Sequence, residues 1–427
     1  MTRSVGIVGG GAAGVLTAIH LCETATHAVA VTIYEPRAQL GAGVAYSTRD
    51  PQHLLNVPAD GMSIFPDQPH HFTQWAGVNG NDFVERHRYA HYLRETLQSR
   101  LERAPHVVLE HRCEPVLNLS IGTNEEPHQQ LIVHTGTATQ THDAVVIATG
   151  NAAPTRPAWV SEHERIIHDP WSTGALANIA PGDRVACIGT GLTFVDIALT
   201  LTAAGATVHG YSRHGLLPHA HAAVGTLPQP PHMTTPREVL RWLRQQHDWR
   251  AAIAALRPIT SELWQSFDDR QRRQFLRHPM RYWEIHRHRM APQVAAQLQQ
   301  HLHTGNISIH QSNVVRVDLT QGVRLHNTNG EVSDEYDWLV LCTGPSDDSS
   351  SAGGLLSTLI AAGTARRGHA GMGVDSDPVT GALISAAAAV HPHVFVIGTM
   401  RRGTLWETTA IPELRSQAKA LAKVLAY

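Results

Sequence analysis

Three glycines and a glutamate near the start of the chain have the types and spacing of a dinucleotide site. Gly9, Gly11 and Gly14 form a Gly-x-Gly-x-x-Gly motif, and Glu35 follows 21 positions after the third glycine. The first glycine permits a tight turn, the second lets the backbone approach a pyrophosphate, and the third allows close helix packing. A carboxylate at the position of Glu35 can accept hydrogen bonds from an adenosine ribose.

The elements around this motif follow the pattern that such a site requires. Residues 5–8 predict a short strand, residues 15–22 repeat apolar side chains at helical spacing, and residues 28–34 predict a second strand. The second strand leads directly into Glu35. A glycine turn between a strand and a helix, followed by a strand that ends at an acid, predicts a Rossmann-like unit.

A second glycine turn repeats this arrangement later in the chain. Gly189 and Gly191 lie between an apolar strand, residues 184–188, and a helical pattern that reaches residue 201. Phe194 occupies the third glycine position, which predicts a looser contact between helix and strand. The next strand, residues 206–211, ends at Ser212 and Arg213. An arginine at the ribose end can accommodate a 2′-phosphate, which favours NADPH over NADH.

Two further strands resemble segments of flavoproteins that hold two dinucleotides. Residues 143–150 end in Ala-Thr-Gly, with Thr149 and Gly150, and resemble the segment that closes the FAD-binding half of those proteins. Residues 337–344 have the same form and would close the second unit. The chain would then return to the first unit through a strand at 393–398 and a helix at 410–425. In such proteins this last strand ends in Gly-Asp near the flavin ribityl chain, whereas Gly398 is followed here by Thr399.

The expected fold class is therefore α/β, with two Rossmann-like dinucleotide-binding domains, the second inserted into the first. We expect an FAD-binding domain over residues 1–165 and 345–427, and an NAD(P)-binding domain over residues 166–344. A helical insertion at about 236–303 would cap the second site, because apolar residues recur there at three- and four-residue spacing. The expected cofactors are FAD and NAD(P)H, because the nicotinamide delivers a hydride that the flavin accepts.

Composition narrows the remaining possibilities. The formal net charge is −2, so the chain has no overall attraction to nucleic acid or to an anionic membrane. The four cysteines are far apart, no metal-binding spacing occurs, and we expect no metal site and each cysteine to be a buried small apolar residue. No signal peptide or run of 18 apolar residues is present, which predicts a cytoplasmic protein without a membrane partner. The sequence does not indicate an oligomeric state.

Reduced flavin can pass its electrons to a protein disulfide, to an external acceptor or to dioxygen. The absence of a Cys-x-x-Cys motif argues against the first. The segment "IIHDPWST", with His168 and Trp171, resembles the linker of Baeyer–Villiger and N-hydroxylating flavin monooxygenases, although it lacks their full spacing. Five more segments together resemble a bacterial FAD/NAD(P)-binding family that is similar to class B flavin monooxygenases: residues 40–48, 53–67, 212–219, 281–292 and 401–418.

This resemblance implies a monooxygenase that uses dioxygen on a small polar substrate. It favours hydroxylation of urate to 5-hydroxyisourate, a reaction of purine metabolism. The expected substrate contacts are Arg401, Arg402 and Glu407, and Asn56 resembles a position that lines the isoalloxazine. His286, Arg287 and His288, from the arginine-rich middle of the chain, are further candidates for lining the pocket. Two alternatives stay open: N-hydroxylation of an amine or amino acid, and an FAD-binding protein without catalysis.

Overall fold

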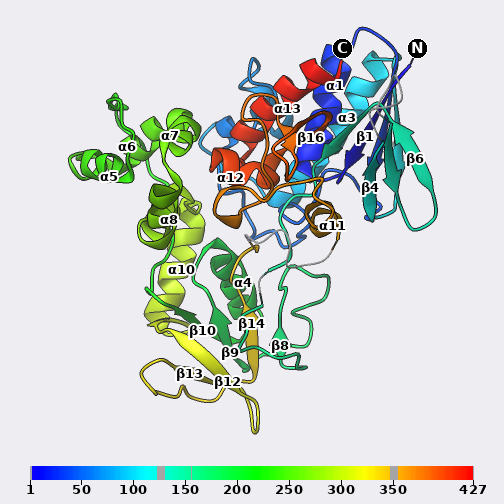
Figure 1. The fold of residues 1–427 in the computed structure, drawn as a ribbon. Helices are drawn as coiled ribbons and strands as arrows, with labels where there is room; N and C mark the ends of the chain where they lie inside the picture. The colour runs from blue at the N-terminus through cyan, green and yellow to red at the C-terminus, as the bar shows by residue number, and fades with distance from the viewer. Residues whose placement is uncertain (1, 123–129, 155, 347–353, 427) are drawn as a thin grey trace.

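The computed structural model describes residues 2–122, 130–154, 156–346 and 354–426. Two sheets of mainly parallel strands, each covered by helices, form the body of the molecule (Figure 1). The chain builds part of the first sheet, then the whole second sheet, and then returns to the first. This order confirms the expected α/β fold with one Rossmann-like unit inserted into another. The residue bounds of the two domains stay a prediction.

The first sheet has the strand order β15-β16-β7-β1-β2-β3. Only β15 runs antiparallel to its neighbour, and the other pairings are parallel. The central strands are buried because both faces of the sheet are covered, one by helices and the other by a small antiparallel sheet and one short helix. The strands are β1 (Arg3–Val8), β2 (Val29–Tyr34), β3 (Val107–Arg112), β7 (Ala144–Ile147), β15 (Ala382–Ile384) and β16 (Val390–Val396).

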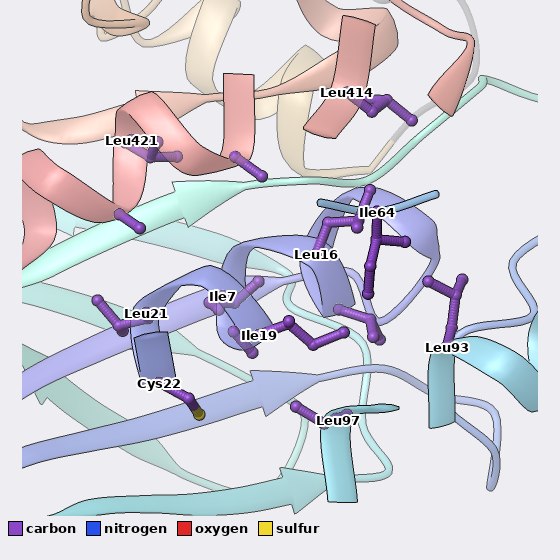
Figure 2. Close-up of a cluster of buried hydrophobic side chains, with 14 of the residues drawn as sticks. Ile7, Leu16, Ile19, Leu21, Cys22, Ile64, Leu93, Leu97, Leu414 and Leu421 are labelled. Atoms are coloured by element: carbon purple, nitrogen blue, oxygen red, sulfur yellow. The ribbon is translucent and has the colours of Figure 1, made fainter. Parts of the chain in front are cut away.

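Helix α1 (Ala12–Thr24) lies at the centre of the first unit and is apolar on nearly all sides. It packs between the sheet and two other helices, α3 (Arg86–Arg103) and α13 (Ile411–Leu425). Figure 2 shows Leu16 and Leu21 of α1 facing Leu414 and Leu421 of α13. The C-terminal helix therefore completes the core that the N-terminal motif begins.

The second sheet has the strand order β11-β10-β9-β14-β8, and all of its pairings are parallel. Helix α4 (Leu192–Ala203) follows the second glycine turn and packs against α10 (Pro292–Thr304). Phe194 is fully buried in this core. The strands are β8 (Ile166–Ile167), β9 (Arg184–Ile188), β10 (Thr207–Ser212), β11 (Ile307–Gln311) and β14 (Trp338–Leu341).

A group of short helices separates β10 from α10, as the apolar spacing predicts. Capping boxes set two of their starts, Thr235 with Glu238 and Asp268 with Gln271. Leu298 of α10 is buried in the core of the second sheet, and the expected bounds of the insertion, about 236–303, stay a prediction. We use "helical insertion" below for its helices: α5 (Pro236–Arg244), α6 (Trp249–Leu256), α7 (Thr260–Ser266), α8 (Asp269–Arg277) and α9 (Met280–Arg287).

The remaining elements are short. Two small antiparallel sheets contain β4, β5 and β6, and β12 and β13. Among the described residues, no helix is both long and apolar enough to cross a membrane. The bounds are β4 (Asn118–Ile121), β5 (Leu131–His134), β6 (Thr139–His142), β12 (Val314–Asp318), β13 (Arg324–Asn327), α2 (His71–Ala76), α11 (Leu355–Ala361) and α12 (Arg402–Leu405).

Polar contacts join the two units where α3 meets α4. Arg86 forms a buried ion pair with Asp196, with 2.7 Å between Nη2 and Oδ2. His53 Nε2 lies 2.9 Å from Thr200 Oγ1. Trp171 from the linker packs edge-on against His53 and beneath the Arg86 guanidinium. We call this set of residues the domain seam.

Candidate functional site

The first glycine turn has the geometry of a pyrophosphate site. Gly9 has a φ of +106°, and a Cβ at this position would overlap the carbonyl oxygen of Ala148, so the turn requires glycine. Gly11 is the N-cap of α1, and no side chain caps this helix. The first amides of α1 can therefore bind an anion, as the helix dipole favours.

Glu35 lies beside this turn, as expected from the sequence. It is 7% exposed, and its Oε2 accepts a hydrogen bond from the Gly10 N–H at 3.0 Å. Its Oε1 accepts a second from the Arg37 N–H at 3.1 Å. The carboxylate is thus fixed next to the glycine turn with lone pairs still available for a ribose hydroxyl.

The other predicted flavin contacts lie at the same edge of the first sheet. Thr149 and Gly150 follow β7, and Gly398 and Thr399 follow its parallel neighbour β16. A Cβ at Gly398 would contact Ala13 of α1, which brings the end of β16 to the glycine turn. Thr399, at the position where similar flavoproteins have an acid, donates from Oγ1 to Asn151 Oδ1 at 2.9 Å. These residues, with Gly9, Gly11, Gly14 and Glu35, fit FAD, and their individual contacts stay predictions.

The second glycine turn borders a cavity of about 480 Å³, which we call the nucleotide cavity. Gly189, Gly191, Ser212 and the exposed Arg213 all line it, so the predicted residues are together. Ser212 Oγ lies 2.8 Å from Thr190 Oγ1, which fixes the end of β10 beside the turn. No side chain caps α4, so its first amides can also bind an anion.

Phe194, which occupies the third glycine position of the motif, does not loosen the contact between α4 and the neighbouring strand as expected. A Cβ at Gly210 of β10 would lie only 2.7 Å from the Phe194 ring. Glycine at position 210 therefore makes room for the ring, which fills the space between helix and strand. A compensating small residue on a neighbouring strand cannot be recognised from the turn motif alone.

Several residues that line the nucleotide cavity are absent from the sequence prediction. Asn313 follows β11, the strand beside β10, and polar residues at the carboxyl end of a parallel strand are a usable signal. Arg281 and Glu284 come from α9 of the helical insertion, and nothing in their sequence spacing points to the cavity. Arg281 and Arg213 both suit a phosphate because each has a delocalised, permanent positive charge.

The three residues expected to contact substrate, Arg401, Arg402 and Glu407, have separate environments. Arg402 lines the nucleotide cavity, and its guanidinium lies 4.8 Å from the centre of the Trp406 ring. Arg401 is buried, and its Nη2 donates to the carbonyl oxygens of Asp377 and Pro378 at 3.0 and 2.8 Å. Burial lowers the pKa of Arg401 to about 10. These contacts indicate that Arg401 holds the 377–378 turn.

Glu407 belongs to a buried ionic network. Its carboxylate lies 3.2 Å from Arg287 Nη2 and accepts a hydrogen bond from Trp283 Nε1 at 2.9 Å. Burial alone would raise the pKa of Glu407, but the charge of Arg287 and then that of His288 lower it below its ordinary value. Glu407 is not among the residues that line the nucleotide cavity.

Asn56 and the middle histidines also lie near the junction of the two units. Asn56 is half-buried, and its carbonyl oxygen accepts a hydrogen bond from His221 Nε2 at 3.0 Å. His288 lines the nucleotide cavity, whereas His286 lines a separate cavity in the helical insertion. His168 Nε2 lies 3.3 Å from Glu162.

The cysteines only partly match the expectation. Cys22, Cys187 and Cys342 are buried, but Cys113 is exposed because it lies just past the end of β3, beside His111. A hydrogen bond between the Cys342 thiol and Cys187, together with burial, raises the pKa of Cys342 well above its ordinary value. Among the described residues, no group of three His, Cys, Asp or Glu side chains has the placement of a metal site.

Comparison with known proteins supports the dinucleotide assignment. Residues 6–152 match a family model described as FAD-NAD(P)-binding. No curated protein matches the sequence. The matched range contains the first glycine turn, Glu35 and the Thr149-Gly150 pair.

Similar solved structures cover nearly the whole chain. An ornithine N-hydroxylase from Kutzneria sp. 744 superposes with a TM-score of 0.67 at 16% identity, over 100% of this chain and 99% of that one. An ornithine hydroxylase from Pseudomonas aeruginosa gives 0.65 at 15% identity, with coverage of 100% and 99%. A bacillithiol disulfide reductase from Staphylococcus aureus gives 0.61 at 14% identity, with coverage of 99% and 97%. At these identities the likeness establishes the fold.

Proposed function

We propose that this protein is an FAD-dependent NAD(P)H oxidoreductase, and that it is a monooxygenase which hydroxylates a nitrogen atom of a small molecule. The observation that supports it most is the composition of the nucleotide cavity. Residues of the second glycine turn and Arg402, which follows the end of β16, line the same space. A nicotinamide bound there would lie beside the segment that leads away from the flavin site.

When bound, FAD takes up two electrons from the nicotinamide and passes them to dioxygen. The chain itself positions the reactants. The amides of α1 and α4 would hold the two pyrophosphates, Glu35 would hold a ribose, and Arg213 with Arg281 would hold a 2′-phosphate. Residues of α9 bring the helical insertion to one wall of the nucleotide cavity.

The similar structures support N-hydroxylation over urate hydroxylation, which the sequence had favoured. Two of those reported above are named as ornithine hydroxylases, and nothing in the comparisons supports urate or purine metabolism. Disulfide reduction is the rival that the third structure raises. It is disfavoured because Cys342, the cysteine in the nucleotide cavity, has a raised pKa and therefore little thiolate.

Flavin reduction tests the oxidoreductase part of this proposal. The purified protein should be yellow, and its flavin should bleach when NADPH or NADH is added without oxygen. A flavin that stays oxidised would support the alternative of a binding protein without catalysis.

Substrate-stimulated oxidation of NAD(P)H tests the monooxygenase part. Under air, an amine substrate should accelerate NAD(P)H oxidation and yield a hydroxylamine that mass spectrometry detects as a gain of one oxygen atom. Urate serves as the comparison compound. Acceleration by urate, with a hydroxylated product and none from amines, would reverse the preference stated here.

A further inference from the structure

A second cavity of about 480 Å³ lies inside the helical insertion, and we call it the aromatic cavity. Four tryptophans, two phenylalanines and a tyrosine line it together with aliphatic side chains. The aromatic residues are Trp249, Trp264, Phe267, Phe275, Tyr282, Trp283 and Trp406. A cavity of this volume and lining is typical of a site for a small organic molecule.

The aromatic cavity adjoins the nucleotide cavity. Helix α9 separates them: Tyr282 and His286 line the aromatic cavity, whereas Arg281 and Glu284 line the nucleotide cavity. Trp406 lines the first and stacks with Arg402, which lines the second. A ligand in the aromatic cavity would therefore lie close to the nucleotide cavity, with Trp406 and Arg402 between them.

The flavin-binding part of the chain closes one side of the aromatic cavity. Trp264 Nε1 donates to the Gly403 carbonyl oxygen at 2.8 Å, and Ser261 Oγ donates to the Leu405 carbonyl oxygen at 3.1 Å. Trp406 then stacks on Trp264, with 4.9 Å between ring centres. These contacts fix the segment that follows β16 against α7. Figure 1 shows α7 beside α12, which belongs to this segment.

Trp406 has two unusual properties. Its φ of +65° is rare for a bulky residue and marks a backbone held by its surroundings, often at a ligand site. Its ring is buried, yet Nε1 has no hydrogen-bond partner within the described part of the chain. Buried indole N–H groups usually find a partner, so an acceptor atom of a ligand would satisfy this one.

The charges around the aromatic cavity indicate which ligands it excludes. None of the described residues that line it carries a carboxylate, and Arg244 at its edge is exposed. An alkyl diammonium ion would lose its hydration there without gaining a counter-ion. An uncharged aromatic ring would instead bury its surface against the indole and phenyl rings.

We infer that the aromatic cavity is the substrate pocket, and that the substrate is a small, uncharged aromatic nitrogen compound with a hydrogen-bond acceptor for Trp406 Nε1. This inference rests on the proposed function, because it names the substrate class of the same enzyme. It separates this protein from enzymes whose substrates are charged aliphatic amines.

Binding to the oxidised, FAD-loaded protein tests the pocket without any turnover. Isothermal titration calorimetry would compare quinoline, which has an acceptor nitrogen, with naphthalene, which has the same shape but no acceptor, and with 1,5-diaminopentane. We expect saturable binding of one quinoline per chain, about five-fold weaker binding of naphthalene, and no saturable binding of the diamine. The heat capacity change on quinoline binding should be negative, since apolar surface is buried.

Three variants locate the binding. Leu243→Gln, which places an amide in the cavity wall, should weaken quinoline binding at least ten-fold. Leu276→Gln changes a partly buried leucine that packs against the same helices but does not line the cavity, and it should leave binding unchanged. Trp406→Phe should remove the preference for quinoline over naphthalene, because phenylalanine lacks the N–H.

The outcomes separate the pocket from the proposed function. Absence of quinoline binding, or binding that Leu243→Gln and Leu276→Gln affect equally, would overturn the inference even if NADPH bleaches the flavin. A quinoline preference that survives in Trp406→Phe would overturn the role of Nε1. Quinoline binding with a flavin that NAD(P)H cannot reduce would leave the pocket standing and overturn the oxidoreductase.

Discussion

At the scale of single residues, Arg213 is the residue of the nucleotide cavity that we expect to bind the 2′-phosphate of NADPH. Its side chain is exposed at the end of β10 and lines the cavity. Arg213→Ala should raise the KM for NADPH in flavin reduction about ten-fold and the KM for NADH less than two-fold, because a charge-assisted contact to phosphate is lost. Stopped-flow reduction under nitrogen measures both.

Arg237→Ala is the matched control for this substitution. Arg237 is an exposed arginine on α5, outside the nucleotide cavity, and its loss should change neither constant. Equal weakening of NADPH and NADH in Arg213→Ala would show that Arg213 binds no 2′-phosphate.

A substitution at Gly191 can distinguish NADPH binding from FAD binding, because the fold leaves room for a side chain at this position. Its φ is −80°, and no atom lies within 4 Å of a Cβ built there. Gly191→Ala should therefore keep its melting temperature and FAD content, but its methyl group would occupy space that a pyrophosphate needs, and NADPH binding should weaken at least ten-fold. Absorbance at the flavin band and anaerobic reduction measure the two effects.

Gly136→Ala serves as the control, since Gly136 also has no atom within 4 Å of a built Cβ and lies far along the chain from both glycine turns. It should behave as the unmodified protein. An unchanged affinity for NADPH in Gly191→Ala would argue against a dinucleotide at the second turn.

At the scale of elements, local sequence patterns predicted the units that carry the cofactors. Strands β1 and β9 were expected within two residues of their observed bounds, because an apolar run that ends at a glycine turn is a local signal. The position of Gly189, Gly191, Ser212 and Arg213 around one cavity could be predicted because these residues follow such strands directly, while their contacts to a nucleotide stay predictions. The helical insertion was predicted as helical, but its division into five short helices depends on caps and turns that periodicity does not locate.

The contacts between elements could not be predicted in this way. Glu407 and Arg287 are 120 positions apart, and nothing local indicates that they pair. The role of Glu407 as a substrate contact stays a prediction, and no local pattern indicates that Gly210 accommodates Phe194. Pairing across the chain has to be seen in three dimensions.

The network around Glu407 holds the helical insertion to the flavin-binding part of the chain. Arg257 Nε donates to Glu413 Oε1 at 2.6 Å at the start of α13, while Arg287 contacts both Glu407 and Glu413. Glu407→Gln should lower the free energy of unfolding by about 2 kcal/mol, because Arg287 stays buried with one partner weakened. Thermal and urea unfolding measure this loss.

The exposed Glu162 provides a control, and Glu162→Gln should leave stability unchanged. A Glu407→Gln protein of normal stability that binds both cofactors but no longer hydroxylates substrate would instead support the role predicted from the sequence.

At the scale of the whole molecule, the domain seam joins the two units that carry the glycine turns. Burial raises the pKa of Asp196, and the nearby charges of Arg86 and His53 partly offset this effect. Arg86 thus compensates a carboxylate that would otherwise be buried alone. We expect the domain seam to be rigid only while Arg86 compensates the charge of Asp196. Hydride transfer requires that the nicotinamide and flavin rings stay close together.

Arg86→Met should weaken the seam in a pH-dependent manner. Without Arg86 the pKa of Asp196 rises further above its value in the unfolded chain, so the folded state is favoured at low pH and loses stability as pH rises through that raised pKa. The melting temperature should therefore fall more at pH 8 than at pH 5, and flavin reduction by NADPH should slow at pH 8 while FAD content is unchanged.

The double variant Arg86→Met with Asp196→Leu is the control. It removes the buried charge and should restore most of the stability, and the melting temperature should then no longer depend on pH through this site. If Arg86→Met loses the same stability at every pH, Asp196 is not the group that Arg86 compensates, and the seam depends on packing against Trp171 instead.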